Sequence, residues 1–325
     1  MKAVVLLPEL SPERVSPERQ RRDTVTPSLA LRANTLALRV ADYLELSKPR
    51  VAVLVLFTVG IGFALAAGAA LDVLRLLHTL LGTALVAAGA SALNQFLERR
   101  SDGLMRRTEN RPLPAGRLQP LEVLLFGAGV GLAGVVYLLV TLPPLAALTA
   151  AVTFLSYVFV YTPLKRKTTL NTLIGAVPGA LPPLIGWTAA GGSLGLAALG
   201  LFLVLFLWQV PHFLAIAWIF RDDYARAGLR MLPAVDPCGA LTGWSMVAWC
   251  VALIPASLLP VALGGAGWVY LAGAVLLGAG FLATAIGFLR VHALARARWV
   301  LRASLVYLPA LLALLLLDGA FKLPS

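Results

Sequence analysis

Three oxygen-bearing side chains recur at every fourth position in the first third of the chain, at Asn94, Glu98 and Asp102. Because an α-helix has about 3.6 residues per turn, this spacing places all three on one helix face. Divalent cations such as Mg²⁺ prefer carboxylate and carbonyl oxygens and commonly keep positions for water or substrate phosphate. The stripe therefore predicts a Mg²⁺ site. The competing interpretation is a polar helix end with weak surface ion pairs.

A loop rich in arginine and proline follows the stripe and contains Arg106, Arg107 and Arg111. Guanidinium groups bind phosphate oxygens in a bidentate manner. Taken alone, a basic loop is more often a topology signal or a contact to lipid headgroups. Beside an acidic stripe it becomes a candidate diphosphate site, with metal ligands on one side and arginines on the other.

A second charged loop carries the adjacent carboxylates Asp222 and Asp223, followed by Tyr224. Its spacing leaves two interpretations open, a second Mg²⁺ site facing the first or a solvated loop. Upstream, Gln209 and His212 lie within a long apolar run. An ionisable side chain at membrane depth is by default a hypothesis for a functional site, so His212 is predicted to contact a substrate. The alternative is a hydrogen-bonded packing residue.

The elements that must position these residues are membrane spans. Of the 325 residues, 59% are hydrophobic and 13% are charged, whereas about 25% are charged in an average soluble protein. Apolar runs of about 20 residues, the length of a membrane-crossing helix, recur along the chain. They lie near 51–71, 76–97, 121–141, 144–162, 170–189, 195–219, 241–263, 267–289 and 300–318. The sequence thus predicts an all-α, polytopic transmembrane helical bundle of about nine spans.

Basic residues alternate with these spans. They crowd the segment before span one and the connections after spans two, four, six and eight. The connections 142–144, 189–193 and 264–267 contain no Lys or Arg, and Arg75 is the main exception. The positive-inside rule then predicts that the charged face and the N-terminus are cytoplasmic. The formal charge of +12 lies between apolar spans, which favours anionic membrane lipid or a phosphorylated substrate over nucleic acid.

The fifth span combines glycines and prolines and begins at Asn171. Prolines remove backbone donors and are tolerated in a span where the freed carbonyls face protein or a cavity. We therefore expect a bent helix that lines a pocket, with Asn171 completing a ring of polar groups.

The N-terminal part of the chain differs in composition from the spans. Prolines and a cluster of arginines interrupt any apolar core of a signal peptide there. We expect residues 1–42 to form a disordered cytoplasmic tail and residues 43–325 to form one transmembrane domain.

Five ordered motifs resemble the UbiA-type superfamily of intramembrane prenyltransferases. Segment 94–114 is similar to its first acidic motif, whereas segments 161–166, 175–183, 208–213 and 223–233 resemble the branch that farnesylates protohaem IX. The resemblance is dense from Lys48 to Pro233 and rests on hydropathy alone over the last three spans. The sequence departs from the superfamily at Ala227, where a second Asp is usual four residues after Asp223, and at Glu98, where Asp is common.

The resemblance implies catalytic roles for Asn94, Glu98, Asp102 and Asp223. The first three would hold Mg²⁺ against farnesyl diphosphate, and Asp223 with Asp222 would form a second acidic metal site. His212 would lie near haem B. The implied substrate-binding residues are Lys48, Arg106, Arg107, Arg111, Tyr161, Lys165, Arg166, Asn171, Gln209, His212, Asp222 and Tyr224.

The activity implied by the resemblance is transfer of a farnesyl group to a vinyl group of haem B, with addition of water, in a bacterial cytoplasmic (inner) membrane. Haem A synthase and terminal oxidase assembly proteins are the implied protein partners. Two alternatives stay open on the residues. One is prenyl transfer to an aromatic acid or quinone precursor, and the other is a non-enzymatic transporter of a polyisoprenoid or an anion.

Overall fold

A computed structural model describes residues 29–320 of the protein, and the side chains of residues 37–318. The chain divides into two compact units, residues 1–43 and 44–325. Residues 1–28 of the predicted disordered tail lie outside the described residues. From Leu29 onward that tail differs from the prediction, because it forms the start of helix α2 (Leu29–Leu46). Leucine, alanine and arginine, which are strong helix formers, dominate this stretch.

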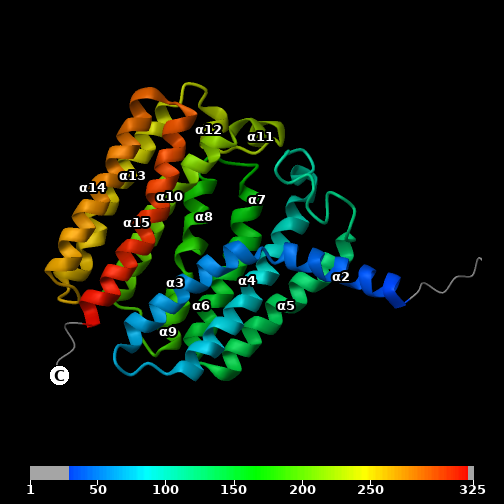
Figure 1. Ribbon diagram of the computed structural model, residues 1–325, viewed down its shortest axis with the longest axis horizontal. Helices are drawn as coiled ribbons and strands as arrows, with labels where there is room; N and C mark the ends of the chain where they lie inside the picture. Colours follow the sequence, from blue (N-terminus) through cyan, green and yellow to red (C-terminus); the bar gives the residue numbers. More distant parts are fainter. Residues whose placement is uncertain (1–28, 321–325) are drawn as a thin grey trace, which may run out of the picture. The chain divides into compact units, whose positions relative to one another are not determined.

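Unit 44–325 is a bundle of helices (Figure 1). Within residues 29–320, nine helical segments are long and apolar enough to cross a membrane, which confirms the predicted number of spans. The elements are α3 (Pro49–Ala67), α4 (Val73–Asp102), α5 (Pro120–Thr141), α6 (Pro144–Leu155), the π-helix η1 (Ser156–Tyr161), α7 (Thr162–Leu164), α8 (Asn171–Ala180), α9 (Pro182–Ala189), α10 (Leu196–Ile219), α11 (Arg221–Arg226), α12 (Leu232–Val235), α13 (Ala240–Ala262), α14 (Trp268–Val291) and α15 (Leu294–Ala320).

Several helices begin where the sequence provides a start signal. Proline opens α3, α5, α6 and α9, at a position where its missing N–H would have no helical partner. The Asp72 carboxylate accepts a hydrogen bond from the Arg75 amide at the start of α4, and Gln119 and Glu122 form a capping box on α5. These local signals set the ends of the spans that carry the site.

Glycine brings two helix pairs into close contact. A Cβ on Gly89 of α4 would lie 2.5 Å from the backbone nitrogen of Gly131 on α5. A Cβ on Gly62 of α3 would lie 1.9 Å from the carbonyl oxygen of Pro183 on α9. Small residues allow this backbone approach in membranes, where packing rather than the hydrophobic effect drives association between helices.

Two spans are irregular. The fifth is divided at Leu181, between its prolines Pro178 and Pro182, into α8 and α9, and the expected bend and pocket lining stay predictions. The fourth contains the six-residue π-helix η1 between α6 and α7, a feature that the apolar run does not predict. Short π-helical segments within α-helices are frequent at functional sites, and η1 ends at Tyr161 beside the basic turn.

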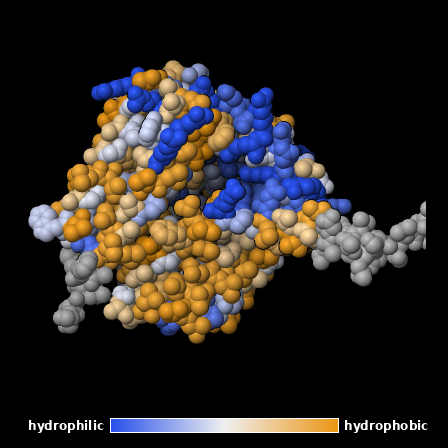
Figure 2. Space-filling model, viewed as in Figure 1, coloured by the Kyte–Doolittle hydropathy of each residue, from blue (hydrophilic) through white to orange (hydrophobic). Residues whose placement is uncertain are grey.

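Polar side chains gather at one end of unit 44–325. The loop of residues 103–119, α7, α11 and α12 lie at this end in Figure 1. Figure 2 shows hydrophilic side chains around a hollow there, whereas hydrophobic side chains cover most of the remaining visible surface. We refer to this region as the charged end. It brings together segments that lie far apart in the sequence.

Candidate active site

The predicted oxygen stripe lies on the last turns of α4. This helix continues to Asp102, beyond the predicted end of the span at residue 97. Asn94, Glu98 and Asp102 are all buried. Burial of an amide and two carboxylates is unfavourable unless each has a hydrogen-bond or ion-pair partner. In this protein each of the three side chains has such a partner.

Asn94 is bound from two sides. Its Oδ1 accepts a hydrogen bond from Lys48 Nζ at 3.1 Å, and its Nδ2 donates to Thr162 Oγ1 at 3.1 Å. Thr162 itself donates to the carbonyl oxygen of Tyr157 within the π-helix η1. The deepest member of the stripe is therefore fixed by residues that precede the first span and end the fourth.

Glu98 pairs with Lys165, whose Nζ lies 2.6 Å from Glu98 Oε1 and 4.6 Å from the centre of the Tyr161 ring. Burial alone lowers the pKa of Lys165, but the charge and hydrogen bond of Glu98, together with Tyr161 and Tyr157, outweigh it and hold that pKa above its usual range. Lys165 thus carries a positive charge at physiological pH. It contributes to the site from the turn that follows η1 and α7.

Asp102 is bound by the loop that follows its own helix. Arg111 Nη1 lies 2.7 Å from Asp102 Oδ2, and the hydroxyl of Thr108 donates to the Asp102 carbonyl oxygen. Asp102 Oδ1 is buried and has no hydrogen-bond partner among the described residues. Buried carboxylate oxygens without a partner are rare because they are energetically unfavourable. A cation bound to Asp102 Oδ1 would supply the missing partner.

Two more basic residues adjoin the stripe. Arg166 Nη2 donates to the Ser101 hydroxyl at 3.1 Å. Burial lowers the pKa of Lys48 to about 7, and the nearby charge of Arg111 adds to this effect. Three basic side chains, Lys48, Lys165 and Arg111, thus lie against an amide and two carboxylates of the stripe. The charged end can therefore accommodate an anion.

The oxygen donors fit a Mg²⁺ ion in type, and Asp102 Oδ1 is free to bind one. Among the described residues, no group of three or more His, Cys, Asp or Glu side chains is arranged to hold a metal. The stripe supplies two carboxylates and one amide. Such a set suits a Mg²⁺ ion that takes its other ligands from water and substrate phosphate.

Arg107 connects the two charged loops. Its Nη2 donates to the hydroxyl of Tyr224 on α11 at 2.8 Å. Its guanidinium also lies over two rings, 4.9 Å from the centre of Tyr224 and 5.1 Å from that of Phe220. The first basic loop and the segment around α11 are thus held together by one arginine.

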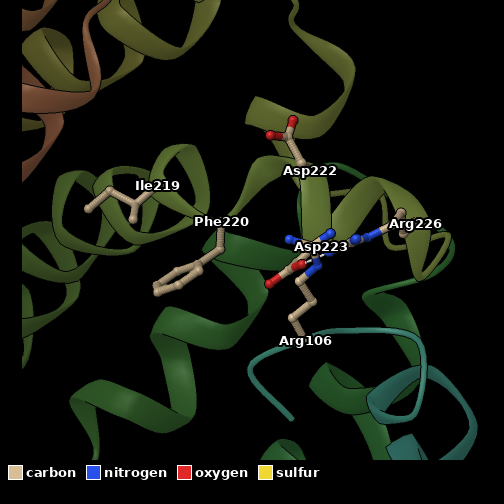
Figure 3. A pocket seen from close by; sticks show the side chains of 6 residues that line it. All are labelled: Arg106, Ile219, Phe220, Asp222, Asp223 and Arg226. Carbon is tan, nitrogen blue, oxygen red and sulfur yellow. Dashed lines mark hydrogen bonds and ion pairs between the residues drawn. The ribbon is translucent and has the colours of Figure 1, made fainter. Parts of the chain in front are cut away.

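Beside this contact lies an open pocket of about 380 Å³ lined by Arg106, Ile219, Phe220, Asp222, Asp223 and Arg226 (Figure 3). Asp223 points toward Arg106 and pairs with Arg226, whereas Asp222 points the opposite way. The Asp222 side chain is 93% exposed and lies 3.7 Å from Arg221. Consecutive residues on a helix diverge in direction, so the two carboxylates do not form the adjacent pair that their spacing allowed.

Three predicted site residues lie away from the stripe. Asn171 donates to the carbonyl oxygens of Thr168 and Arg230, which joins two loops through the backbone. Gln209 donates to the carbonyl oxygen of Leu205 at 3.0 Å. His212 contacts α15 rather than α4. Asn171 thus links two loops at the charged end, and its place in a ring of polar groups at a substrate site stays a prediction.

Sequence reasoning did not single out Thr162, Ser101 or Ser304. Thr162 binds Asn94, Ser101 binds Arg166, and Ser304 binds His212. Thr162 lies inside segment 161–166, so the motif that carries the family resemblance already contained it. Ser304 lies in an apolar span without a motif, and no local pattern identifies it.

The sequence model of the family described as "UbiA prenyltransferase family" matches residues 55–317. A relative from Solibacter usitatus, named protoheme IX farnesyltransferase, is 48% identical over 85% of this chain and 98% of its own length. A relative of the same name from Salinibacter ruber is 47% identical with the same coverage.

Solved structures share the fold at lower identity. A digeranylgeranylglyceryl phosphate synthase superposes with a TM-score of 0.74 at 19% identity, over 87% of this chain and 99% of its own. A UbiA homologue from Archaeoglobus fulgidus bound to DMAPP and Mg²⁺ superposes with a TM-score of 0.60 at 16% identity, over 87% of this chain and 100% of its own. These likenesses confirm the helical membrane fold.

Proposed function

We propose that this chain, which belongs to the UbiA prenyltransferase family, transfers the farnesyl group of farnesyl diphosphate to a vinyl group of haem B. Addition of water would then give haem O and diphosphate, for the biogenesis of haem A and terminal oxidases. The relatives named above support the choice of acceptor, because they align with 85% of the chain. The observation that carries the proposal is the buried stripe of Asn94, Glu98 and Asp102, faced by cations from three segments.

The side chains of the charged end match the needs of a departing diphosphate. Lys48, Lys165 and Arg111 already lie against the stripe, and Arg107 and Arg166 lie on adjoining segments. Positive groups fixed before the reaction stabilise charge that develops in the transition state without reorganising. They would favour cleavage of the allylic carbon–oxygen bond of farnesyl diphosphate.

Asn94, Glu98 and Asp102 are the residues that would hold Mg²⁺, and Asp223 is a candidate for a second ion. A bound Mg²⁺ supplies Lewis-acid neutralisation of the phosphate oxygens. The related Archaeoglobus fulgidus protein bound to DMAPP and Mg²⁺ supports this assignment. The unpaired, buried Asp102 Oδ1 supports it independently.

After the carbon–oxygen bond breaks, the farnesyl cation would be attacked by the π-electrons of the haem vinyl group. Water would add to the resulting cation and release a proton, which leaves a hydroxyethylfarnesyl side chain. The apolar bundle would keep bulk water from the farnesyl cation before this attack. No protein nucleophile is needed for these steps.

The chain is an integral, multi-pass membrane protein. We propose that it lies in a bacterial inner membrane with the charged end facing the cytoplasm, because the basic connections, with Arg75 as the main exception, fall on that side of the alternating spans. Haem A synthase and terminal oxidase assembly proteins are the proposed partners, since they would receive the product.

One assay tests this function against the alternatives. Membranes that contain the full chain would receive Mg²⁺, farnesyl diphosphate and either haem B or 4-hydroxybenzoate, and products would be identified by mass. We expect haem O and diphosphate with haem B. Prenylated 4-hydroxybenzoate would favour a quinone-precursor transferase. Solute flux in proteoliposomes without diphosphate release would favour a transporter.

A further inference from the structure

The last span makes a contact with α10 that the chemistry of the stripe does not use. Trp208 and His212 lie one helical turn apart on α10, and both bind Ser304 of α15. Trp208 Nε1 donates to the Ser304 carbonyl oxygen at 2.8 Å, and His212 Nδ1 lies 2.7 Å from Ser304 Oγ. The indole also stacks on the imidazole, with ring centres 4.8 Å apart and planes inclined by 22°. The imidazole is thus fixed at one edge and on one face.

The short contacts of Ser304 Oγ define where the protons lie. This oxygen is 2.7 Å from the Leu301 carbonyl oxygen and 2.7 Å from His212 Nδ1. Each contact at this distance requires a proton between the two heavy atoms. The hydroxyl has one proton and the carbonyl has none. The hydroxyl therefore donates to Leu301, and His212 Nδ1 donates to the hydroxyl.

A neutral imidazole that carries its proton on Nδ1 leaves a lone pair on Nε2. The ring contacts of His212 are Trp208, Phe213 and Ser304, and a charged imidazolium is unfavourable in such surroundings at membrane depth. Within the described part of the chain, His212 Nε2 makes no hydrogen bond, and the side chain is half-buried. Its lone pair remains available to a ligand.

Metal-binding histidines almost always donate their second ring N–H to a fixed acceptor, which sets the tautomer and the orientation of the ring. Neutral imidazole nitrogen is also a common ligand of haem iron. We propose that His212 Nε2 binds the iron of the haem acceptor and that Ser304 is the positioning residue that holds His212 in the required tautomer. This inference rests on the proposed function, because the iron belongs to the acceptor substrate.

A packing role for the same contact would predict a different pattern. Hydrogen bonds between transmembrane helices contribute little to stability on average, and Trp208 already joins α10 to the Ser304 backbone. Packing would account for the bond at Nδ1 and would not depend on Nε2. Binding of a porphyrin without iron distinguishes the two roles, because iron ligation by His212 affects only the binding of haem.

The test uses the full chain in detergent, titrated with haem B or with metal-free protoporphyrin IX in the absence of farnesyl diphosphate. Ser304→Ala removes the acceptor, and Ser304→Thr keeps a hydroxyl. Ser257→Ala is the matched control, since Ser257 is a buried span serine whose hydroxyl donates to the Ile254 carbonyl oxygen at 2.7 Å. Absorption spectra would report affinity and iron ligation together.

We expect Ser304→Ala to weaken haem binding about 10- to 100-fold, the range typical for loss of a group that orients a metal ligand. Its affinity for metal-free protoporphyrin should stay unchanged. Ser304→Thr should restore haem affinity and the Soret position, and Ser257→Ala should match the wild type. In turnover, the KM for haem should rise while the KM for farnesyl diphosphate does not.

Equal losses for both porphyrins, or an unchanged haem affinity in Ser304→Ala, would overturn the inference. Resonance Raman spectra of the wild-type ferrous haem complex test it without any variant, and absence of an iron–histidine stretch would also overturn it. If the wild-type protein farnesylates haem and one of these results is still found, only the role of Ser304 and His212 is refuted. A wild-type protein that does not farnesylate haem refutes the proposed function.

Discussion

Replacement of Asp102 by asparagine separates a metal-binding role of the stripe from a structural one. The substitution keeps the shape of the side chain and removes its negative charge. In the structure, Asp102 Oδ2 pairs with Arg111 while Oδ1 is buried without a partner. The first oxygen contributes to folding, and the second is available for a ligand. The change should therefore affect stability and activity to different extents.

The expected loss of stability is modest. A hydrogen bond to a charged group contributes about 1.5–3 kcal/mol. The Arg111 side chain is 23% exposed, so water screens part of this interaction, and we expect the lower end of the range. The expected loss of activity is larger, because removal of one electrostatic stabiliser of a transition state costs about 10²–10³-fold in kcat. Asp102→Asn should thus be folded and nearly inactive.

The assay measures haem O formation over a series of Mg²⁺ concentrations, together with the unfolding temperature in detergent. Asp236→Asn is the matched control. Asp236 is also buried, and its carboxylate binds the amide and the hydroxyl of Thr242 at 2.8 Å each, without contact to the stripe. It should lose stability and keep its activity. The Mg²⁺ concentration needed for half-maximal rate should rise for Asp102→Asn and stay constant for Asp236→Asn.

Two results would refute this reasoning. Wild-type activity in Asp102→Asn would exclude the residue as a metal ligand. A loss of activity that parallels the loss of folded protein, with an unchanged Mg²⁺ requirement, would show that Asp102 acts through structure alone.

Two further predictions concern stability. Gly62→Ala should lower the unfolding temperature in detergent, because its Cβ would lie 1.9 Å from the Pro183 carbonyl oxygen, whereas Gly60→Ala on the same helix meets no atom within 4 Å and should stabilise by about 0.5–1 kcal/mol. Equal effects of the two variants would contradict the close packing of α3 and α9. Burial raises the pKa of Asp236, but its hydrogen bonds from Thr242 outweigh this and hold the pKa below its usual value. Its stabilisation should therefore be complete above about pH 3.9 and be lost in stronger acid, so the difference in unfolding temperature between wild type and Asp236→Asn should shrink there; a constant difference would refute this assignment.

The spans and the stripe could be predicted because both depend on local periodicity. Apolar runs define helices that cross a membrane, and the four-residue spacing of Asn94, Glu98 and Asp102 defines a helix face. Neither depends on how the helices pack. The apolar run ends near residue 97 whereas α4 continues to Asp102, because charged residues end an apolar run without ending a helix.

Contacts between distant segments could not be predicted in the same way. The partners of Asn171 and His212 lie 59 and 92 residues away, and their identity depends on the rotation of one helix against another. The same limit applies to the interpretation of Asp222 and Asp223. Their spacing is compatible with a shared ion, and it is the position of α11 that directs one toward Arg106 and the other to solvent.

The balance of charge at the stripe favours an anionic substrate over a purely structural role. Desolvation can cancel most of the Coulombic gain of a buried ion pair, so the two ion pairs on this helix face, Lys165–Glu98 and Arg111–Asp102, are poorly explained by stability. Three cations, Lys48, Lys165 and Arg111, also face two carboxylates, which leaves positive charge uncompensated. A diphosphate carries the negative charge that would restore the balance, and the site is arranged to receive it.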